Sequence, residues 1–173
     1  MTDDDLGLLA EAASMGDDAA LRQLVLATEA SIRSACRRLG SPADAEDLAQ
    51  ETYLRALRAL PTFRGDAPVR VWLLSIARHV CADHVRKRTR RADIDARFRP
   101  RPLVSLPDER FAVDDLIRSI DPAQREAFVL TQELGLSYDE AAAMCGCPVG
   151  TIRSRVARAR ANLAELVVAA EAG

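Results

Sequence analysis

Aromatic residues and long apolar runs are scarce in this chain of 173 residues. Aromatic side chains make up 4% of a sequence that is 49% hydrophobic, so its cores must be built from Leu, Val, Ile and Ala. Such cores favour packed helices over sheets. No run of about 18 apolar residues occurs, which excludes a transmembrane helix, and the acidic N-terminus lacks the basic start of a signal peptide. We therefore expect no membrane insertion and a cytoplasmic location.

Metal-binding cysteine motifs are also lacking. The four cysteines are Cys36, Cys81, Cys145 and Cys147. The last two form C-x-C, whereas zinc sites typically use C-x-x-C. Free cysteine is commonly a small core residue, so we expect buried or half-buried thiols and no metal or cofactor, with a metal or redox site as the alternative.

Charge is distributed unevenly behind the net value of −2. Residues 64–101 carry 11 Arg and Lys against 4 Asp, whereas residues 1–63 and 102–173 are acidic. A basic middle indicates a local contact with nucleic acid. Because phosphate would repel the acidic parts, the chain should not grip DNA strongly by itself. This pattern predicts a larger partner that helps to hold the DNA.

Helical periodicity and cap signals divide the chain into two parts. Four helices are predicted in a first domain, 1–91, and four in a second, 111–173. Pro100, Pro102 and Pro107 interrupt the segment between them, so residues 92–110 are predicted to be a linker. The predicted fold is all-α, with two small helical domains joined by a Pro-containing linker.

Local signals also predict helix ends and buried faces. Asp17 should cap the second helix, and Gly40 should close it as a C-cap glycine. Ser41-Pro42 should open the third helix, and Asp121-Pro122 should open the sixth. On the fifth helix, from Phe111 to Ile120, Val113 is expected inside. The fourth helix, over 69–90, is expected to bury a stripe at helical spacing. That stripe comprises Val69, Trp72, Leu73, Ile76, Ala77, Val80 and His84.

The stretch 135–163 predicts a helix-turn-helix. Ser137 and Glu140 have the spacing of a capping box, and Gly146 and Pro148 break the first helix. The polar face of the second helix suits the DNA major groove, since arginine pairs bidentately with guanine and also binds phosphate. A merely solvated arginine face, or a unit that binds protein, is the alternative.

Two further stretches suggest binding surfaces. Acidic residues crowd 44–51, where they can stabilise the helix dipole, take part in metal or acid–base chemistry, or dock a basic partner. The basic helix that ends at Arg91, beside a loop with Phe63, could hold melted DNA, because charge tracks the backbone and apolar faces stack on bases. Trp72 fits a plain core position better.

These residues resemble a known family. Residues 44–88 resemble region 2, and residues 121–163 resemble region 4, of the bacterial extracytoplasmic-function (ECF) sigma factors of the sigma-70 family. Residues 78–84 and 145–160 are most similar to actinobacterial members of the sigma-C type. The resemblance covers nearly the whole chain. It implies an RNA polymerase subunit, without catalytic activity of its own, that recognises the −10 and −35 promoter elements.

The resemblance also implies roles for individual residues. Docking on the β′ clamp helices of core polymerase is implied for Asp44, Asp47, Gln50 and Glu51. Capture of the melted −10 element is implied for Phe63, Arg64, Gly65, Asp66, Arg78, His79 and Asp83. Reading of the −35 element is implied for Thr151, Arg153, Ser154, Arg155 and Arg158. Two departures bear on specificity: His79 stands where many members have Asn, and Ala157 stands where some carry a larger residue.

The implied partners are core RNA polymerase, through its β′ clamp helices and β flap, and promoter DNA. An anti-sigma factor could hold the protein inactive. Three other functions are compatible with parts of the sequence. They are a stand-alone helix-turn-helix repressor, a magnesium-dependent nuclease that uses the carboxylates of 44–51, and a helical adaptor.

Overall fold

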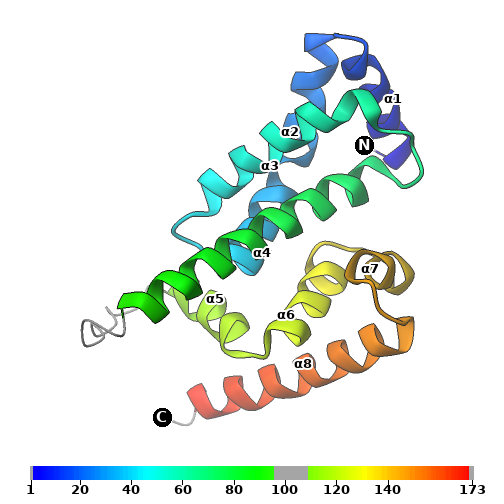
Figure 1. Cartoon of the computed structure of the whole chain (residues 1–173). Helices are drawn as coiled ribbons and strands as arrows, with labels where there is room; N and C mark the ends of the chain where they lie inside the picture. The colour runs from blue at the N-terminus through cyan, green and yellow to red at the C-terminus, as the bar shows by residue number, and fades with distance from the viewer. Residues whose placement is uncertain (1, 96–108, 172–173) are drawn as a thin grey trace. The chain divides into compact units, whose positions relative to one another are not determined.

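The computed structural model describes residues 2–95 and 109–171, and every regular element in these ranges is helical (Figure 1). The all-α prediction is thereby confirmed. The chain divides into two compact units, Met1–Ala82 and Asp83–Gly173. This division lies within a helix, so the boundary at residue 91 stays a prediction. The predicted linker lies largely outside the described residues.

The first unit is built from four helices. They are α1 (Asp3–Ser14), α2 (Asp18–Ala35), α3 (Ala45–Ala59) and α4 (Val69–Asp95), the last of which continues into the second unit. The start of α1 is a capping box, in which the Thr2 amide donates to Asp5 Oδ2 at 2.8 Å and thereby lowers the pKa of Asp5. Asp17 Oδ1 accepts from the amides of Ala19 and Ala20 at 2.8 and 3.0 Å, which confirms the predicted cap of α2.

The core of the first unit is aliphatic, and Thr28 and Tyr53 form a part-buried polar contact between α2 and α3. Its most deeply buried large side chains include Ile32, Leu73 and Leu74. The Thr28 hydroxyl lies 2.9 Å from the Tyr53 hydroxyl and donates to the Leu24 carbonyl at 2.8 Å. Burial raises the pKa of Tyr53. The phenol therefore stays protonated and can satisfy this contact.

The predicted buried stripe of α4 is partly wrong. Its aliphatic members Val69, Leu73, Ala77 and Val80 are buried, but Trp72, Ile76 and His84 are only half-buried. Val71, Leu74 and Cys81 are buried instead. Spacing alone indicates that a helix has an apolar face, whereas the neighbouring helices decide how the helix is rotated and how wide that face is.

Gly40 has a different role from the one predicted. It ends a π-helical turn, Cys36–Gly40, and it is not in the left-handed region that a C-cap glycine adopts. A Cβ at this position would lie 2.5 Å from Leu48 Cδ1 and 3.3 Å from Cys81 Sγ. Glycine leaves room here for side chains from α3 and α4, and a larger residue would force the Leu48 side chain to shift.

The start of α3 is also later than predicted. The helix begins at Ala45 and not at Pro42. Residues 41–44 form a turn, in which the Asp44 amide donates to the Ser41 carbonyl at 3.2 Å. Proline favours the first position of a helix but favours a turn equally well. Here Pro42 lies in the turn that reverses the chain direction between α2 and α3.

The second unit contains the remaining helices. They are α5 (Glu109–Ser119), α6 (Pro122–Phe128), a π-helical turn (Val129–Glu133), α7 (Tyr138–Cys145) and α8 (Val149–Glu171). Asp121 Oδ1 accepts from the amides of Ala123 and Gln124 at 2.9 and 3.1 Å, which confirms the predicted cap of α6. Val113 is 51% exposed, so the expectation that it lies inside was wrong.

Candidate nucleic-acid and polymerase interfaces

A helix-turn-helix is formed by α7, a short turn and α8. The Glu140 amide donates to Ser137 Oγ at 3.1 Å, and the Ser137 amide donates to Glu140 Oε2 at 2.7 Å, which completes the predicted capping box. Gly146 adopts φ +64° and ends α7, and the Cys147 amide donates to the Ala142 carbonyl at 3.1 Å. Local sequence signals therefore set both ends of the first helix.

We expect Ser137→Ala to lower the free energy of unfolding of this helix pair by about 1 kcal/mol, because the alanine leaves the Glu140 amide without its cap. Amide hydrogen exchange of residues 138–145 measures this loss locally. Ser119→Ala is the matched control, since the Ser119 hydroxyl donates only to a helical carbonyl, that of Leu116. Equal protection of α7 in both variants would contradict the assigned cap.

The inner face of α8 anchors the helix in the second unit. Ile152, Val156 and Ala159 are fully or almost fully buried. Asn162 Nδ2 donates to Gln124 Oε1 of α6 at 2.9 Å, and Arg160 bonds to Gln132 Oε1 of the π-helical turn. These contacts fix the rotation of α8 and thereby select the residues that face solvent.

The outer face of α8 carries small residues between two arginines. Gly150, Ser154 and Ala157 follow one another at helical spacing, and all are exposed. Arg153 and Arg158 are also exposed, one on each side of this line. Small side chains let the helix backbone approach another surface closely, while the long arginines reach out from its edges.

Two of the predicted −35 residues are placed differently from these arginines. Thr151 and Arg155 are half-buried. Arg155 Nη1 donates to Cys147 Sγ at 3.8 Å, so this guanidinium contacts the turn between the two helices. The Thr151 carbonyl accepts from Ser154 Oγ at 2.9 Å. Of the five candidates, Arg153, Ser154 and Arg158 are the exposed ones.

A second surface lies on the outer face of α3. Asp47 and Gln50 are exposed, and Glu51 is half-buried, with Arg55 Nε bonded to Glu51 Oε1 at 2.7 Å. Leu54 is 50% exposed and shares this face, because it lies seven residues after Asp47. We call these four residues the α3 surface: Asp47, Gln50, Glu51 and Leu54. Sequence reasoning missed Leu54, although its spacing from Asp47 and Gln50 would have indicated it.

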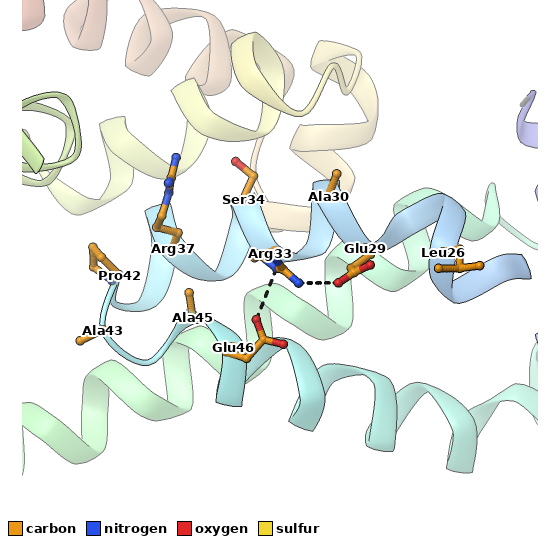
Figure 2. A pocket seen from close by; sticks show the side chains of 10 residues that line it. All are labelled: Leu26, Glu29, Ala30, Arg33, Ser34, Arg37, Pro42, Ala43, Ala45 and Glu46. Atoms are coloured by element: carbon orange, nitrogen blue, oxygen red, sulfur yellow. Dashed lines mark hydrogen bonds and ion pairs between the residues drawn. The ribbon is translucent and has the colours of Figure 1, made fainter. Parts of the chain in front are cut away.

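A groove of about 620 Å³ lies beside the start of α3, between α2 and α3 (Figure 2). Arg33 of α2 lies in it between two carboxylates: its Nε is 3.4 Å from Glu46 Oε2, and its Nη2 pairs with Glu29. Arg33 therefore ties α2 to the first turn of α3 and balances part of the acidic cluster. The predicted Asp44 is half-buried in the preceding turn. Over the described residues, no three His, Cys, Asp or Glu side chains are grouped to hold a metal ion.

A third surface begins at the loop before α4. The loop follows a 3-10 turn, Leu60–Thr62, and Gly65 within it has φ +74°. Arg64 Nε lies 3.3 Å from Asp66 Oδ2, and both side chains are strongly exposed. The Phe63 ring packs against the Trp72 ring, with 4.8 Å between centroids and 41° between planes.

The aromatic pair continues into a stripe along α4. Trp72, Ile76, His79 and Asp83 recur at helical spacing, and all are half-buried or exposed. We call these residues, together with Phe63, the α4 stripe. The His79 Nδ1 atom lies 2.7 Å from the Ser75 carbonyl oxygen. Arg78, also predicted, is half-buried and lies outside the stripe.

Trp72 and Ile76 thus lie on the same face as His79 and Asp83, which are predicted to capture DNA. The sequence had predicted that Trp72 and Ile76 lie in the core. A hollow of about 600 Å³ between α1 and the loop adjoins this region, and Asp3, Glu11 and Asp66 are among its lining residues. Further along α4 a basic run is exposed. It comprises Arg86, Lys87, Arg88, Arg90 and Arg91.

None of the described helices combines the length and apolar character needed to cross a membrane.

Comparison with known proteins identifies both regions. The family model for Sigma-70 region 2 matches residues 28–91, and that for Sigma-70 region 4 matches residues 110–163. The ECF RNA polymerase sigma factor SigC of Mycobacterium tuberculosis is 44% identical over 164 residues, which cover 91% of this chain and 89% of that protein. The ECF RNA polymerase sigma factor EcfG of Rhodopseudomonas palustris is 40% identical over 157 residues, which cover 85% and 84%.

Solved structures agree with these relatives. CnrH in complex with the cytosolic domain of CnrY matches with a TM-score of 0.75 and 32% identity, over 94% of this chain and 96% of that one. RpoE of Bartonella quintana in complex with the anti-sigma factor NepR matches with a TM-score of 0.73 and 30% identity, over 85% and 96%. The chain therefore belongs to the sigma-70 family of RNA polymerase sigma factors, in its ECF group. It acts as a transcription initiation factor, with core polymerase and promoter DNA as its partners.

Proposed function

We propose that three surfaces divide the work of initiation among themselves. The α3 surface docks on core polymerase, the α4 stripe with its loop captures the melted −10 element, and the outer face of α8 reads the −35 element. The observation that carries this proposal is the matching of both sigma regions in one chain, with each predicted surface on an outward-facing part of its helix. A stand-alone repressor, a nuclease or an adaptor does not account for both regions.

The −35 role follows from the shape and charge of α8. The major groove admits one α-helix, and arginine is the side chain that pairs bidentately with guanine. The small residues Gly150, Ser154 and Ala157 allow close approach, so that Arg153 and Arg158 can reach base edges or phosphates on either side. Arg155, which contacts Cys147, is assigned to positioning the turn and not to base readout.

The −10 role follows from an aromatic pair with an exposed arginine next to it in the chain, and from a basic run further along the same helix. Bases of single-stranded DNA stack on apolar faces while cations track the backbone. The Phe63–Trp72 pair offers such a face, and Arg64 and the basic end of α4 offer the charge. His79 and Asp83 extend the stripe with hydrogen-bonding groups that can contact base edges.

When log affinity for promoter DNA is plotted against log salt concentration, Arg64→Ala should make the slope shallower by about 1, the value for one lost phosphate contact. The reason is that Arg64 is an exposed cation beside the aromatic pair. The measurement is a salt titration of promoter binding by the holoenzyme. Arg22→Ala, which removes an exposed arginine from α2, should leave the slope unchanged. A slope that fell equally in both variants would remove Arg64 from the −10 contact.

The docking role follows from the chemistry of the α3 surface. Acidic and amide groups around an exposed leucine suit a partner with basic rims and an apolar centre. We assign this partner to the β′ clamp helices, and a contact of the second unit to the β flap. Two solved relatives bind CnrY or NepR, and we propose that this chain likewise accepts an anti-sigma factor. We place the protein in the cytoplasm and assign it no catalytic step.

The experiment that tests the proposal is run-off transcription with purified core polymerase on a library of GC-rich promoters, with and without this protein. Initiation that depends on the protein and shares a pair of promoter elements is the expected result. Failure to initiate, together with failure to bind core polymerase in a pull-down, would contradict the proposal. Initiation without any shared upstream element would remove the −35 role of α8 alone.

A further inference from the structure

We propose that Cys36 and Cys81 form a redox-active dithiol in the core of the first unit, which hydrogen peroxide closes to a disulfide. The two residues come from different elements, the π-helical turn after α2 and the middle of α4. They are 0% and 1% exposed, and both are free thiols. The proposal does not depend on any contact with DNA or polymerase.

The backbone brings the two side chains together. Cys36 and Gly40 are the first and last residues of one π-helical turn, and such turns are frequent at functional sites. A Cβ on Gly40 would lie 3.3 Å from Cys81 Sγ and 3.7 Å from Cys81 Cβ, so the Cys81 side chain rests on this turn. Cys36, on the same turn, has its Sγ 4.0 Å from Thr52 Oγ1, and the thiols of Cys36 and Cys81 are close enough to shift each other's ionisation.

The pair is asymmetric in its acidity. The hydrogen bond from Cys81 lowers the pKa of Cys36 by more than burial raises it, and Thr52 adds to the lowering. The same bond, together with burial, raises the pKa of Cys81. Because the thiolate is the nucleophile, Cys36 is the sulfur that reacts first and Cys81 is the one that holds a proton.

The reaction balances with peroxide as the oxidant. After a local opening of the core that admits peroxide while Cys36 and Cys81 stay in contact, the Cys36 thiolate attacks one peroxide oxygen, and the O–O bond breaks to give a sulfenic acid and hydroxide. Cys81 gives its proton to this hydroxide, forming water. The Cys81 thiolate then attacks the Cys36 sulfur, the S–O bond breaks, and the departing hydroxide is neutralised by the proton that Cys36 released at the start. Two thiols are oxidised and one peroxide is reduced to two waters.

The product would crosslink elements that are distant in the chain. A disulfide requires its sulfurs to approach to about 2.05 Å, so the two thiols must come closer than an ordinary non-bonded contact. Disulfides in reducing compartments are usually transient and redox-sensing, and not structural. A reversible bond within this core would therefore make the first unit responsive to oxidants.

The test is disulfide mapping of the full-length protein. Reduced, folded protein is treated with hydrogen peroxide, the remaining thiols are blocked with N-ethylmaleimide, and digests are analysed by mass spectrometry without reduction. We expect a crosslink between the Cys36 and Cys81 peptides that dithiothreitol reverses. The double variant Cys145→Ser/Cys147→Ser, which keeps the buried pair, should form the same crosslink. No such crosslink in folded protein, or a crosslink that forms only in urea, would overturn the proposal.

The order of reaction gives a second test. In Cys81→Ser the sulfenic acid on Cys36 cannot be resolved, so dimedone should label Cys36 after peroxide treatment. In Cys36→Ser, Cys81 should stay unlabelled. Labelling of Cys81 alone would reverse the assigned roles and overturn the mechanism. Circular dichroism checks that the serine variants fold, and the wild-type crosslink decides the matter if they do not.

Discussion

Asp47→Arg should weaken binding to core RNA polymerase by about 100-fold or more while leaving the first unit folded. Asp47 is exposed on the outer face of α3, so the arginine meets no packed neighbour within the chain. In the proposed complex it would face the basic rim of the partner, where like charges cost several kcal/mol, and each 1.4 kcal/mol is about tenfold in affinity. The measurement is the dissociation constant for core polymerase, with fluorescently labelled protein.

A matched control separates docking from general electrostatics. Asp18→Arg makes the same charge change at an exposed position in the first turn of α2, away from the α3 surface. It should leave the affinity within about twofold, since exposed charges more than about 10 Å away are largely screened by salt. Leu54→Ala tests the apolar centre of the same surface without changing charge. Unchanged affinity in Asp47→Arg, with a native circular dichroism spectrum, would remove the α3 surface from the interface.

Arg153→Ala and Arg158→Ala should each weaken recognition of the −35 element by about 1–3 kcal/mol, or roughly 5- to 150-fold. Both side chains are exposed at the edges of α8, so their removal costs the contact and not the fold. The measurement compares initiation by the holoenzyme on a promoter and on the same promoter with its −35 element scrambled. Loss of a base contact relaxes this discrimination, whereas loss of a phosphate contact weakens binding to both promoters alike.

The control for these arginines lies on the same helix. Arg160 is exposed, but its guanidinium bonds to Gln132 at the side of α8. Arg160→Ala should therefore reduce discrimination much less than either of the other substitutions. Arg158→Lys retains the charge but not the bidentate geometry, and thus separates base readout from phosphate contact. Normal discrimination in both Arg153→Ala and Arg158→Ala would contradict the assignment of α8.

The positions at which most helices begin follow from short stretches of the amino-acid sequence. Asp17, Asp121 and the Ser137–Glu140 pair cap helices through contacts that span two or three residues. The chemistry of such caps is local, so it can be predicted without knowledge of the fold. The order of the helices, the helix-turn-helix and the resemblance to both sigma regions followed from the same kind of short-range pattern.

The rotation of each helix about its axis, and the side chains that its neighbours can accommodate, became clear only from the packing of the helices. Trp72 and Ile76, which were expected in the core, lie in the α4 stripe, and Leu54 lies with Asp47 and Gln50 on the α3 surface. The packing also showed that Gly40 lies against Leu48 of α3 and Cys81 of α4, where a larger side chain would force its neighbours to shift. These features depend on packing between helices. The free energy of packing comes from the apolar area that several helices bury together, so it cannot be predicted from any single stretch of sequence.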